Sequence, residues 1–408
     1  VGLSVVMLAC SSGKNNKADE PQIVAERDAE EQALKKRQEE LALKKKQEEE
    51  DHRNGKFSYG VAVSSPAMYR VSYLNIKFIG ETGSIGPFGC RTIYGSGIGT
   101  GHDGVARDDE YRYGLPKMLN AAWVSFTERK VYKLTAELPY EEILRRFQES
   151  AALEPRNHKE YVYHTLDLCI LPEGKVVLVL KSSWGKILLD WSAQGEETHE
   201  FDDVILNRVD AVADSMDEYY DYISEVSNDT HWVEYYKTHG LVTPVYDRYL
   251  ERFNYKIIFD YEDKVSKIVK YVQRHTNGEL YWVDPSEFVK LIKHPSRVKN
   301  IRLEWDTKDS HYTGFLYFNE EEVLRIFDEA YGEDRMQQGE LRIKVGADCK
   351  SYDLSLNVGG KSFKLEKTEI RVFQDPIDNP NGDGTLIYKN YEGNHRNLFI
   401  DDEEYFQE

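Results

Sequence analysis

The chain has 408 residues, 31% of them charged, and a formal net charge of −19. Its length is enough for about two or three domains. The acidic balance argues against binding to nucleic acids, because their phosphates require a basic face, and against electrostatic attraction to anionic lipids. The 28 tyrosines, 16 phenylalanines and 6 tryptophans favour strands. No apolar run of 18 residues is present that could span a membrane.

The chain opens with a short apolar segment, residues 1–9, that ends in Met7-Leu8-Ala9 before Cys10. It is too short for a membrane helix and is typical of the remnant of a signal peptide. Residues 7–10 resemble the lipobox of bacterial lipoproteins, in which a signal peptidase cuts before the cysteine and acyl chains are attached to it. The resemblance implies that Cys10 is lipidated, and several acyl chains would give lasting membrane attachment. A buried cysteine on a first strand is the alternative.

Residues 10–20 are polar and predict a flexible tether. Ser11 follows the cysteine where some lipoproteins carry aspartate, and this resembles lipoproteins of the outer membrane. We therefore expect a lipid-anchored protein of the bacterial outer membrane. Whether it faces the periplasm or the cell surface is left open by the sequence.

Residues 21–53 predict a charged helical spacer, because they are rich in Ala, Glu, Lys and Gln and lack glycine. A nine-residue repeat occupies 33–41 and 42–50, and nine residues turn a helix by about 900°. Leu34 and Leu43 therefore lie on opposite faces and form no coiled-coil seam. Opposite charges four residues apart support a single solvated helix. We interpret it as a stalk, with partner binding or a short oligomeric bundle as alternatives.

Residues 54–200 predict a first α+β unit. Two strands and a Gly-rich loop of about 40 residues precede "AAWVSFTERKVYKLTAEL", whose alternation of apolar and polar residues predicts a hairpin. "PYEEILRRFQESAAL" then has helical spacing, with Pro139 suited to the first turn. Three strands joined by tight turns follow.

The first unit resembles an uncharacterised family of bacterial lipoproteins over roughly residues 57–195. The resemblance rests on Leu-Pro before a W-x-S-x-x-E-x-x-x-Y stretch. The residues that match it are Leu115, Pro116, Trp123, Ser125, Glu128 and Tyr132. The motif carries no established chemistry. Some envelope lipoproteins of this kind lie beside secreted toxins and act as immunity proteins, so the resemblance implies immunity as one candidate function.

Residues 201–245 predict a helical linker, and residues 246–408 predict a second, divergent α+β unit. The second unit repeats the order of the first, and Trp305 precedes "EEVLRIF" as Trp123 precedes "EEILRRF". Asn319 is expected to cap the second helix. The fold class that we predict is α+β, with two tandem β-rich units after the N-terminal stalk.

The second unit lacks most of the motif. It keeps Trp305 but has Thr307, Ser310 and Gly314 at the offsets of the Ser, Glu and Tyr. We therefore do not expect a corresponding site there.

Two loops carry weak signals for ligand chemistry. "GTGHDG" at 99–104 satisfies G-x-G-x-x-G, but no helix follows, so a surface loop is the better prediction. His102 and Asp103 in this loop form a candidate acid–base pair, and a solvated loop is again the simpler interpretation.

"NPNGDGT" at 379–385 resembles the start of a calcium loop. The weak metal candidates are Asn379, Asn381 and Asp383. A plain turn is the preferred interpretation. Cys90, Cys169 and Cys349 form no C-x-x-C and suit no zinc site. Cys169 is expected in the core, and disulfide pairing is left open.

The candidates for ligand binding are aromatic and acidic residues of the first unit. Glu128 could act as an acid, but a cross-strand ion pair beside Arg129 and Lys130 is the simpler prediction. Trp184 and Trp191 could stack on sugars, but packing against the neighbouring unit is the simpler prediction. The full set of ligand-binding candidates is Trp123, Glu128, Trp184 and Trp191.

We expect a non-enzymatic, lipid-anchored binding protein with no cofactor and no catalytic residue. Its partner would be a toxin or another envelope protein, which gives the immunity hypothesis, or a surface glycan. A hydrolase in which the Gly-rich loop closes over a site is the remaining class of hypothesis. The membrane is a partner through the lipidated cysteine.

Overall fold

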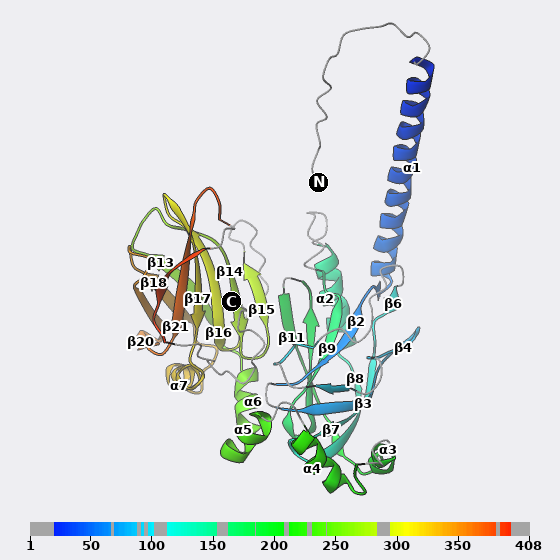
Figure 1. Cartoon of the computed structure of the whole chain (residues 1–408), viewed down its shortest axis with the longest axis vertical. Helices are drawn as coiled ribbons and strands as arrows, with labels where there is room; N and C mark the ends of the chain where they lie inside the picture. The colour runs from blue at the N-terminus through cyan, green and yellow to red at the C-terminus, as the bar shows by residue number, and fades with distance from the viewer. Residues whose placement is uncertain are drawn as a thin grey trace. The chain divides into compact units, whose positions relative to one another are not determined.

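The computed structural model describes residues 20–66, 69–87, 91–93, 97–101, 112–152, 162–183, 185–207, 212–226, 231–241, 243–283, 294–380 and 384–392. Several residues singled out above lie outside this part of the chain: Cys10, Cys90, His102, Asp103, Trp184, Asn381 and Asp383. The chain divides into two compact units, Val1–Asn54 and Gly55–Glu408. The predicted α+β class is confirmed (Figure 1).

The compact unit Val1–Asn54 contains one long helix, α1 (Glu20–Arg53). Its leucines have no apolar partner face: Leu34, Leu41 and Leu43 are 58%, 59% and 71% exposed. The helix therefore buries no apolar stripe, and the ladders of opposite charge that the sequence predicts stay a prediction. At 1.5 Å per residue it is about 51 Å long. Within the described ranges, no helix combines the length and the apolar character needed to cross a membrane.

The compact unit Gly55–Glu408 begins with a first set of strands, which builds two sheets around a helix. β7 and β8 form the predicted hairpin, and α2 and strands β9 to β11 follow as predicted. The elements are β1 (Lys56–Phe57), β2 (Gly60–Ser64), β3 (Val71–Gly80), β4 (Gly83–Ile85), β5 (Arg91–Ile93), β6 (Tyr113–Gly114), β7 (Met118–Ser125), β8 (Lys130–Glu137), α2 (Tyr140–Ala152), β9 (Thr165–Ile170), the 3-10 turn η3 (Pro172–Gly174), β10 (Lys175–Lys181), β11 (Gly185–Gln194) and β12 (Glu196–Glu197).

Four short helices follow: α3 (Asp202–Leu206), α4 (Met216–Val226), α5 (His231–His239) and α6 (Thr243–Leu250). The sequence indicated one or two longer helices for this segment. Ile205, Tyr220 and Trp232 from α3, α4 and α5 pack in one apolar cluster with Val124 and Val131. These helices therefore cover the outer face of the β7–β8 hairpin (Figure 1).

The remaining residues form a second set of strands around a helix. The predicted hairpin is β16 with β17, and Asn319 caps the following helix by accepting a hydrogen bond from the Glu322 amide at 3.1 Å. The elements are β13 (Tyr255–Tyr261), β14 (Lys267–His275), β15 (Leu280–Val283), β16 (Val298–Asp306), β17 (Ser310–Tyr317), α7 (Glu320–Tyr331), β18 (Gly339–Val345), β19 (Tyr352–Val358), β20 (Lys361–Lys364), β21 (Glu369–Pro376) and β22 (Thr385–Lys389).

The strand orders of these two sets are the same. The order β12-β8-β7-β3 in the first set matches β21-β17-β16-β14 in the second, and β2-β9-β10-β11 matches β13-β18-β19-β20. β2 runs parallel to β9, and β13 runs parallel to β18. In both sets the helix follows the hairpin. A short pairing of β11 with β15 joins one sheet of each set into a ten-stranded sheet, β2-β9-β10-β11-β15-β14-β16-β17-β21-β22.

The two cores also use the same aromatic packing. Phe147 of α2 packs edge-on against Phe57 and Tyr59, with ring centroids 5.1 and 6.1 Å away. Phe327 of α7 packs in the same way against Phe253 and Tyr255, at 5.1 and 5.3 Å. Each core therefore locks its helix onto an F-x-Y pair near its first strand.

Part of the Gly-rich loop is not a surface loop. Residues 97–101 are mostly buried, and the Gly101 amide donates to the buried Asp167 carboxylate at 2.9 Å. Ser64 Oγ donates to the same carboxylate at 2.8 Å and accepts from the Gly99 amide at 3.1 Å. A Cβ at Gly101 would lie 2.5 Å from the Val63 carbonyl oxygen. The glycines are therefore needed for close packing, which corrects the surface prediction for residues 97–101.

Candidate functional site

The Trp and Tyr of the W-x-S-x-x-E-x-x-x-Y stretch form the base of the site. Trp123 of β7 and Tyr132 of β8 are register partners, and their rings stack with centroids 5.5 Å apart. Trp123 is 0% exposed, which corrects its prediction as a ligand-binding residue, because no face of the ring reaches solvent. A Cβ at Gly195 would lie 2.6 Å from the Trp123 ring, and one at Gly174 would lie 2.7 Å from Tyr132. The backbone at Gly195 therefore packs directly against the Trp123 ring, and the backbone at Gly174 packs directly against the Tyr132 ring.

Glu128 lies in the turn between β7 and β8 and collects three hydrogen bonds. Tyr69 donates its hydroxyl to Oε2, Tyr132 donates to Oε1 at 3.2 Å, and the Glu173 amide donates to Oε1 at 2.9 Å. The Glu128 amide in turn donates to Ser125 Oγ at 3.2 Å. The Ser, Glu and Tyr of the motif thus fix the hairpin turn and connect it to η3.

The two tyrosines keep their protons in this arrangement. Burial, together with the neighbouring Glu128 carboxylate, raises the pKa of Tyr69 and of Tyr132 above the ordinary value of 10.0. Both hydroxyls therefore remain donors to Glu128 over the whole physiological range.

Arg129 and Lys130, which follow Glu128 in the sequence, form ion pairs with carboxylates other than Glu128. Arg129, in the left-handed region at φ 57°, forms ion pairs with Asp217 at 3.1 Å and Asp221 at 2.7 Å on α4. Lys130 pairs with Glu197 of β12 at 2.8 Å. The predicted cross-strand ion pair of Glu128 is replaced by hydrogen bonds from tyrosines and a backbone amide, because the turn points the carboxylate toward Tyr69 and η3.

A pocket of about 530 Å³ opens over this turn. Its lining residues are Glu128, Lys130, Tyr132, Glu173, Glu197 and Leu241. Three carboxylates thus face one ammonium group, and that ammonium is already paired with Glu197. The excess negative charge suits a ligand that carries an ammonium or guanidinium group.

The other sequence candidates do not join this site. Trp191 is half-buried, packs against the first core and donates Nε1–H to the Glu137 carbonyl at 3.0 Å. Asn379 is exposed, and its amide donates to the Pro376 carbonyl at 3.0 Å in a turn. Cys169 and Cys349 are buried. In the described ranges no group of three His, Cys, Asp or Glu side chains is placed to hold a metal ion.

The second set of strands keeps the stacked pair but not the carboxylate. Trp305 stacks on Tyr312 with centroids 5.2 Å apart, although the motif offset pointed to Gly314. The Thr307 amide donates to the Ser310 carbonyl at 2.9 Å, so only residues 308 and 309 form the turn, against residues 126–129 in the first hairpin. The turn is two residues shorter and has no position for Glu128.

Among the groups that donate to Glu128, those of Tyr69 and Glu173 were not indicated by the sequence. They lie 59 and 45 positions from Glu128, and no local spacing connects them to it. The sequence did contain a signal for Tyr312 as the stacking partner of Trp305. Tyr312 lies two residues before the expected position 314, and the polar turn before it is shorter than residues 126–129.

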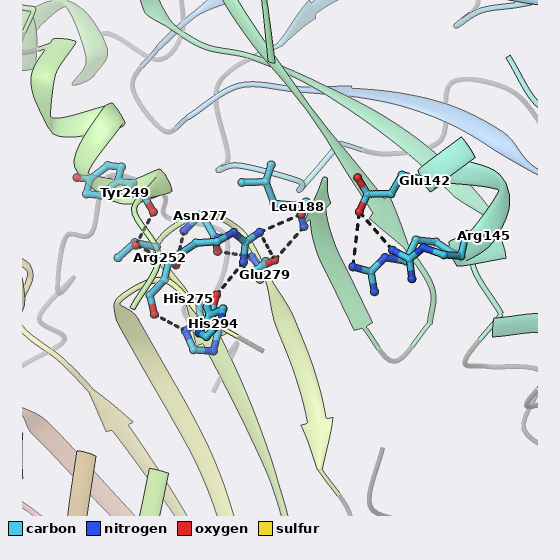
Figure 2. A network of polar contacts seen from close by, with 12 residues as sticks. Glu142, Arg145, Leu188, Tyr249, Arg252, His275, Asn277, Glu279 and His294 are labelled. Carbon is cyan, nitrogen blue, oxygen red and sulfur yellow. Dashed lines mark hydrogen bonds and ion pairs between the residues drawn. The ribbon is translucent and has the colours of Figure 1, made fainter. Parts of the chain in front are cut away.

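A second polar network lies where β11 meets β15 (Figure 2). Arg252 donates two hydrogen bonds to the Glu279 carboxylate, at 2.9 and 3.1 Å, and one each to the Leu188 and His294 carbonyls at 3.0 Å. The Glu279 side chain is 2% exposed and also accepts from the Leu188 amide at 3.2 Å. Because Arg252 and Glu279 bond to each other and both bond to the Leu188 backbone of β11, this network fastens the two sets of strands.

Residues 42–242 match the family described as "Protein of unknown function (DUF2931)". Neither the curated proteins nor the solved structures gave a match. The matched range includes the stacked pair, Glu128 and every residue that lines the pocket.

Proposed function

With residues 42–242 as a DUF2931 domain, we propose that the chain is a lipid-anchored, non-enzymatic binding protein of the bacterial outer membrane. Cys10 is the attachment point in this proposal, and its support is the resemblance of residues 7–10 to a lipobox. The domain binds a partner at the pocket over the β7–β8 turn. The partner is a protein that presents a lysine or arginine side chain.

The exposure of α1 supports its role as a spacer. Leu34, Leu41 and Leu43 are more than half exposed, so the helix offers no apolar stripe for a partner helix. A solvated helix of about 51 Å is suited to separating two attachments. The helix in this proposal holds the binding domain away from the lipid surface.

The observation that carries the binding function is the charge of the pocket. Glu128, Glu173 and Glu197 face Lys130 alone, and a basic side chain entering the pocket would complete the charge balance. A protein partner is favoured over a glycan, because Trp123 is buried and Trp191 is packed against the core. An immunity protein that neutralises a basic toxin is one protein of this kind.

We also propose that the two sets of strands arose by tandem duplication. The matching strand orders, the parallel β2–β9 and β13–β18 pairs and the two Trp–Tyr stacks support it. In this proposal the second copy has lost the Glu128 turn and with it the acidic pocket.

Binding can be tested with the full chain and N-acetyl-lysine methylamide, using the neutral N-acetyl-norleucine methylamide as the matched ligand. Saturation-transfer NMR at millimolar ligand should give a signal for the lysine compound that is lost in an E173Q/E197Q variant. An E81Q variant, which changes a carboxylate paired with Lys117 elsewhere, should behave as the native chain. Equal signals from both ligands, or from both variants, would refute the pocket's role.

The anchor has a separate test. A Cys10→Ser chain expressed with its signal sequence should move from the membrane fraction to the soluble envelope fraction. If it stays with the membrane at the native level, Cys10 is not the attachment point.

A further inference from the structure

Lys130 is the one cationic residue that lines the pocket over the β7–β8 turn. Lys130 and Tyr132 are two residues apart on β8, so their side chains share one face of the strand. Glu197 of β12 is the register partner of Tyr132, and its side chain points to the same face. Glu173 reaches the pocket from η3, between β9 and β10 of the other sheet.

The Lys130 ammonium is attracted by all three carboxylates of the pocket. It is paired with Glu197 at 2.8 Å. The bond to Glu197 raises the pKa of Lys130, and the negative charges of Glu128 and Glu173 raise it further. A cation brought by a ligand experiences the same charges and is therefore drawn to the same place.

Glu128 is not the direct partner of such a cation. Its Oε1 atom already accepts from Tyr132 and from the Glu173 amide, and its Oε2 atom accepts from Tyr69. The direct partners are therefore the carboxylates of Glu173 and Glu197. Among the described residues the Glu173 carboxylate has no ion pair, whereas the Glu197 carboxylate is held by Lys130.

Two residues with left-handed backbone conformation position the charged groups of the pocket. Arg129, directly before Lys130, has φ 57°, and Glu173 has φ 61°. Such a conformation is unfavourable for a residue other than glycine and persists only where the surrounding contacts enforce it. The approach of Lys130 and Glu173 to one pocket is therefore built into the two turns.

The Lys130–Glu197 pair is weak enough to be replaced. The two side chains are 42% and 49% exposed, and ion pairs between exposed side chains contribute little to stability. The lysine side chain is also a flexible four-carbon stem, so the ammonium can leave Glu197 while the β8 backbone stays in place.

We propose that Lys130 is an internal competitor for the pocket: its ammonium occupies the position that the cation of the partner takes, and binding displaces it from Glu197. This inference rests on the proposed function of the pocket. It makes Lys130 a specificity-determining residue, because a neutral group cannot replace the ammonium beside Glu197. Only a cation that bonds to Glu173 and Glu197 restores the lost pair.

The test measures the affinity of the full chain for N-acetyl-lysine methylamide by NMR titration. K130M keeps an apolar stem but removes the competing charge, so it should bind roughly five- to tenfold more tightly than the native chain. K133M is the matched control, because Lys133 lies on the same strand, is paired with Glu200 and does not line the pocket. It should bind as the native chain does.

A second variant and a second measurement keep the test decisive if K130M fails to fold. K130Q should give the same gain in affinity. In the native chain, saturating ligand should shift the Nζ resonance of Lys130 and leave that of Lys133 unchanged.

The outcomes separate this inference from the proposed function. If the native chain binds the lysine compound but K130M and K130Q bind it no more tightly, the inference is overturned and the proposed function stands. An equal gain in K133M would show a general effect of net charge and would also overturn the inference. If the native chain and all three variants bind nothing, both proposals are wrong.

Discussion

The hairpins β7–β8 and β16–β17 share a stacked Trp–Tyr pair but differ in the turn that closes them. The first turn uses residues 126–129 and places Glu128 under Tyr69 and Tyr132, whereas the second uses residues 308 and 309 and carries no equivalent carboxylate. Both strand sets contain the buried pair, and the turns that close the two hairpins differ. The longer turn contributes Glu128 to the acidic pocket, whereas Glu173 and Glu197 come from η3 and β12.

The largest expected effect tests whether the two stacked pairs are equivalent. Trp123→Ala and Trp305→Ala should each lower the free energy of unfolding by about 3–5 kcal/mol, because each removes a fully buried ring. Urea denaturation monitored by circular dichroism measures both. A loss near zero for either variant would break the equivalence.

The next effect concerns a buried histidine of the second strand set. Burial lowers the pKa of His275 from 6.5 to about 4, against the opposing influence of the Glu279 carboxylate and the Ser296 carbonyl, while Arg252 adds to the lowering. The unfolded chain therefore binds a proton that the folded chain rejects. Stability contributed by neutral His275 is complete above pH 6.5 and is lost as the pH falls toward 4, by about 3 kcal/mol.

The stability difference between the native chain and His275→Asn should accordingly shrink over that pH window, as measured by urea denaturation. His199→Asn, at an exposed histidine paired with Asp202, is the matched control. A difference between the native chain and His275→Asn that is independent of pH would contradict the burial argument.

Glu128→Ala sharpens the comparison of the two turns. It removes the Glu128 carboxylate that accepts from the buried Tyr69 hydroxyl and the Glu173 amide. The free energy of unfolding should therefore fall by about 2–3 kcal/mol. Asp309→Ala in the second turn should change the stability by less than about 0.5 kcal/mol. Equal effects in thermal denaturation would show that the two turns do not differ as described.

The smallest expected effect concerns how close a glycine lies to each tryptophan ring. A Cβ at Gly195 would lie 2.6 Å from the Trp123 ring, whereas one at Gly314 would lie 3.0 Å from the Trp305 ring. Gly195→Ala should therefore cost about 1–2 kcal/mol and Gly314→Ala less than about 1 kcal/mol. The reverse order of the urea midpoints would place the closer packing in the second set of strands.

The elements with strong local periodicity could be predicted from the sequence. Both hairpins, the helices after them and the charged α1 follow from apolar spacing and from caps such as Asn319. The short strands β12, β15 and β22 were not predicted, because their two to five residues carry too little pattern.

The site itself depends on contacts that sequence spacing does not reveal. Tyr69 reaches Glu128 across 59 positions, and Asp167 buries the Gly-rich loop from 66 positions away. The partner of Trp305 was misplaced by two residues, because the offset assumed equal turns. Where long-range contacts or turn length decide the geometry, the sequence indicated the residue type but not its role.

We propose that the first turn binds a basic group and that the second does not. Titrating the isotope-labelled full chain with N-acetyl-lysine methylamide and following the amide resonances tests it residue by residue. We expect saturable shifts at residues 128, 130, 173 and 197 and none at residues 307–310. Shifts of equal size at both turns, or none at the first, would contradict it.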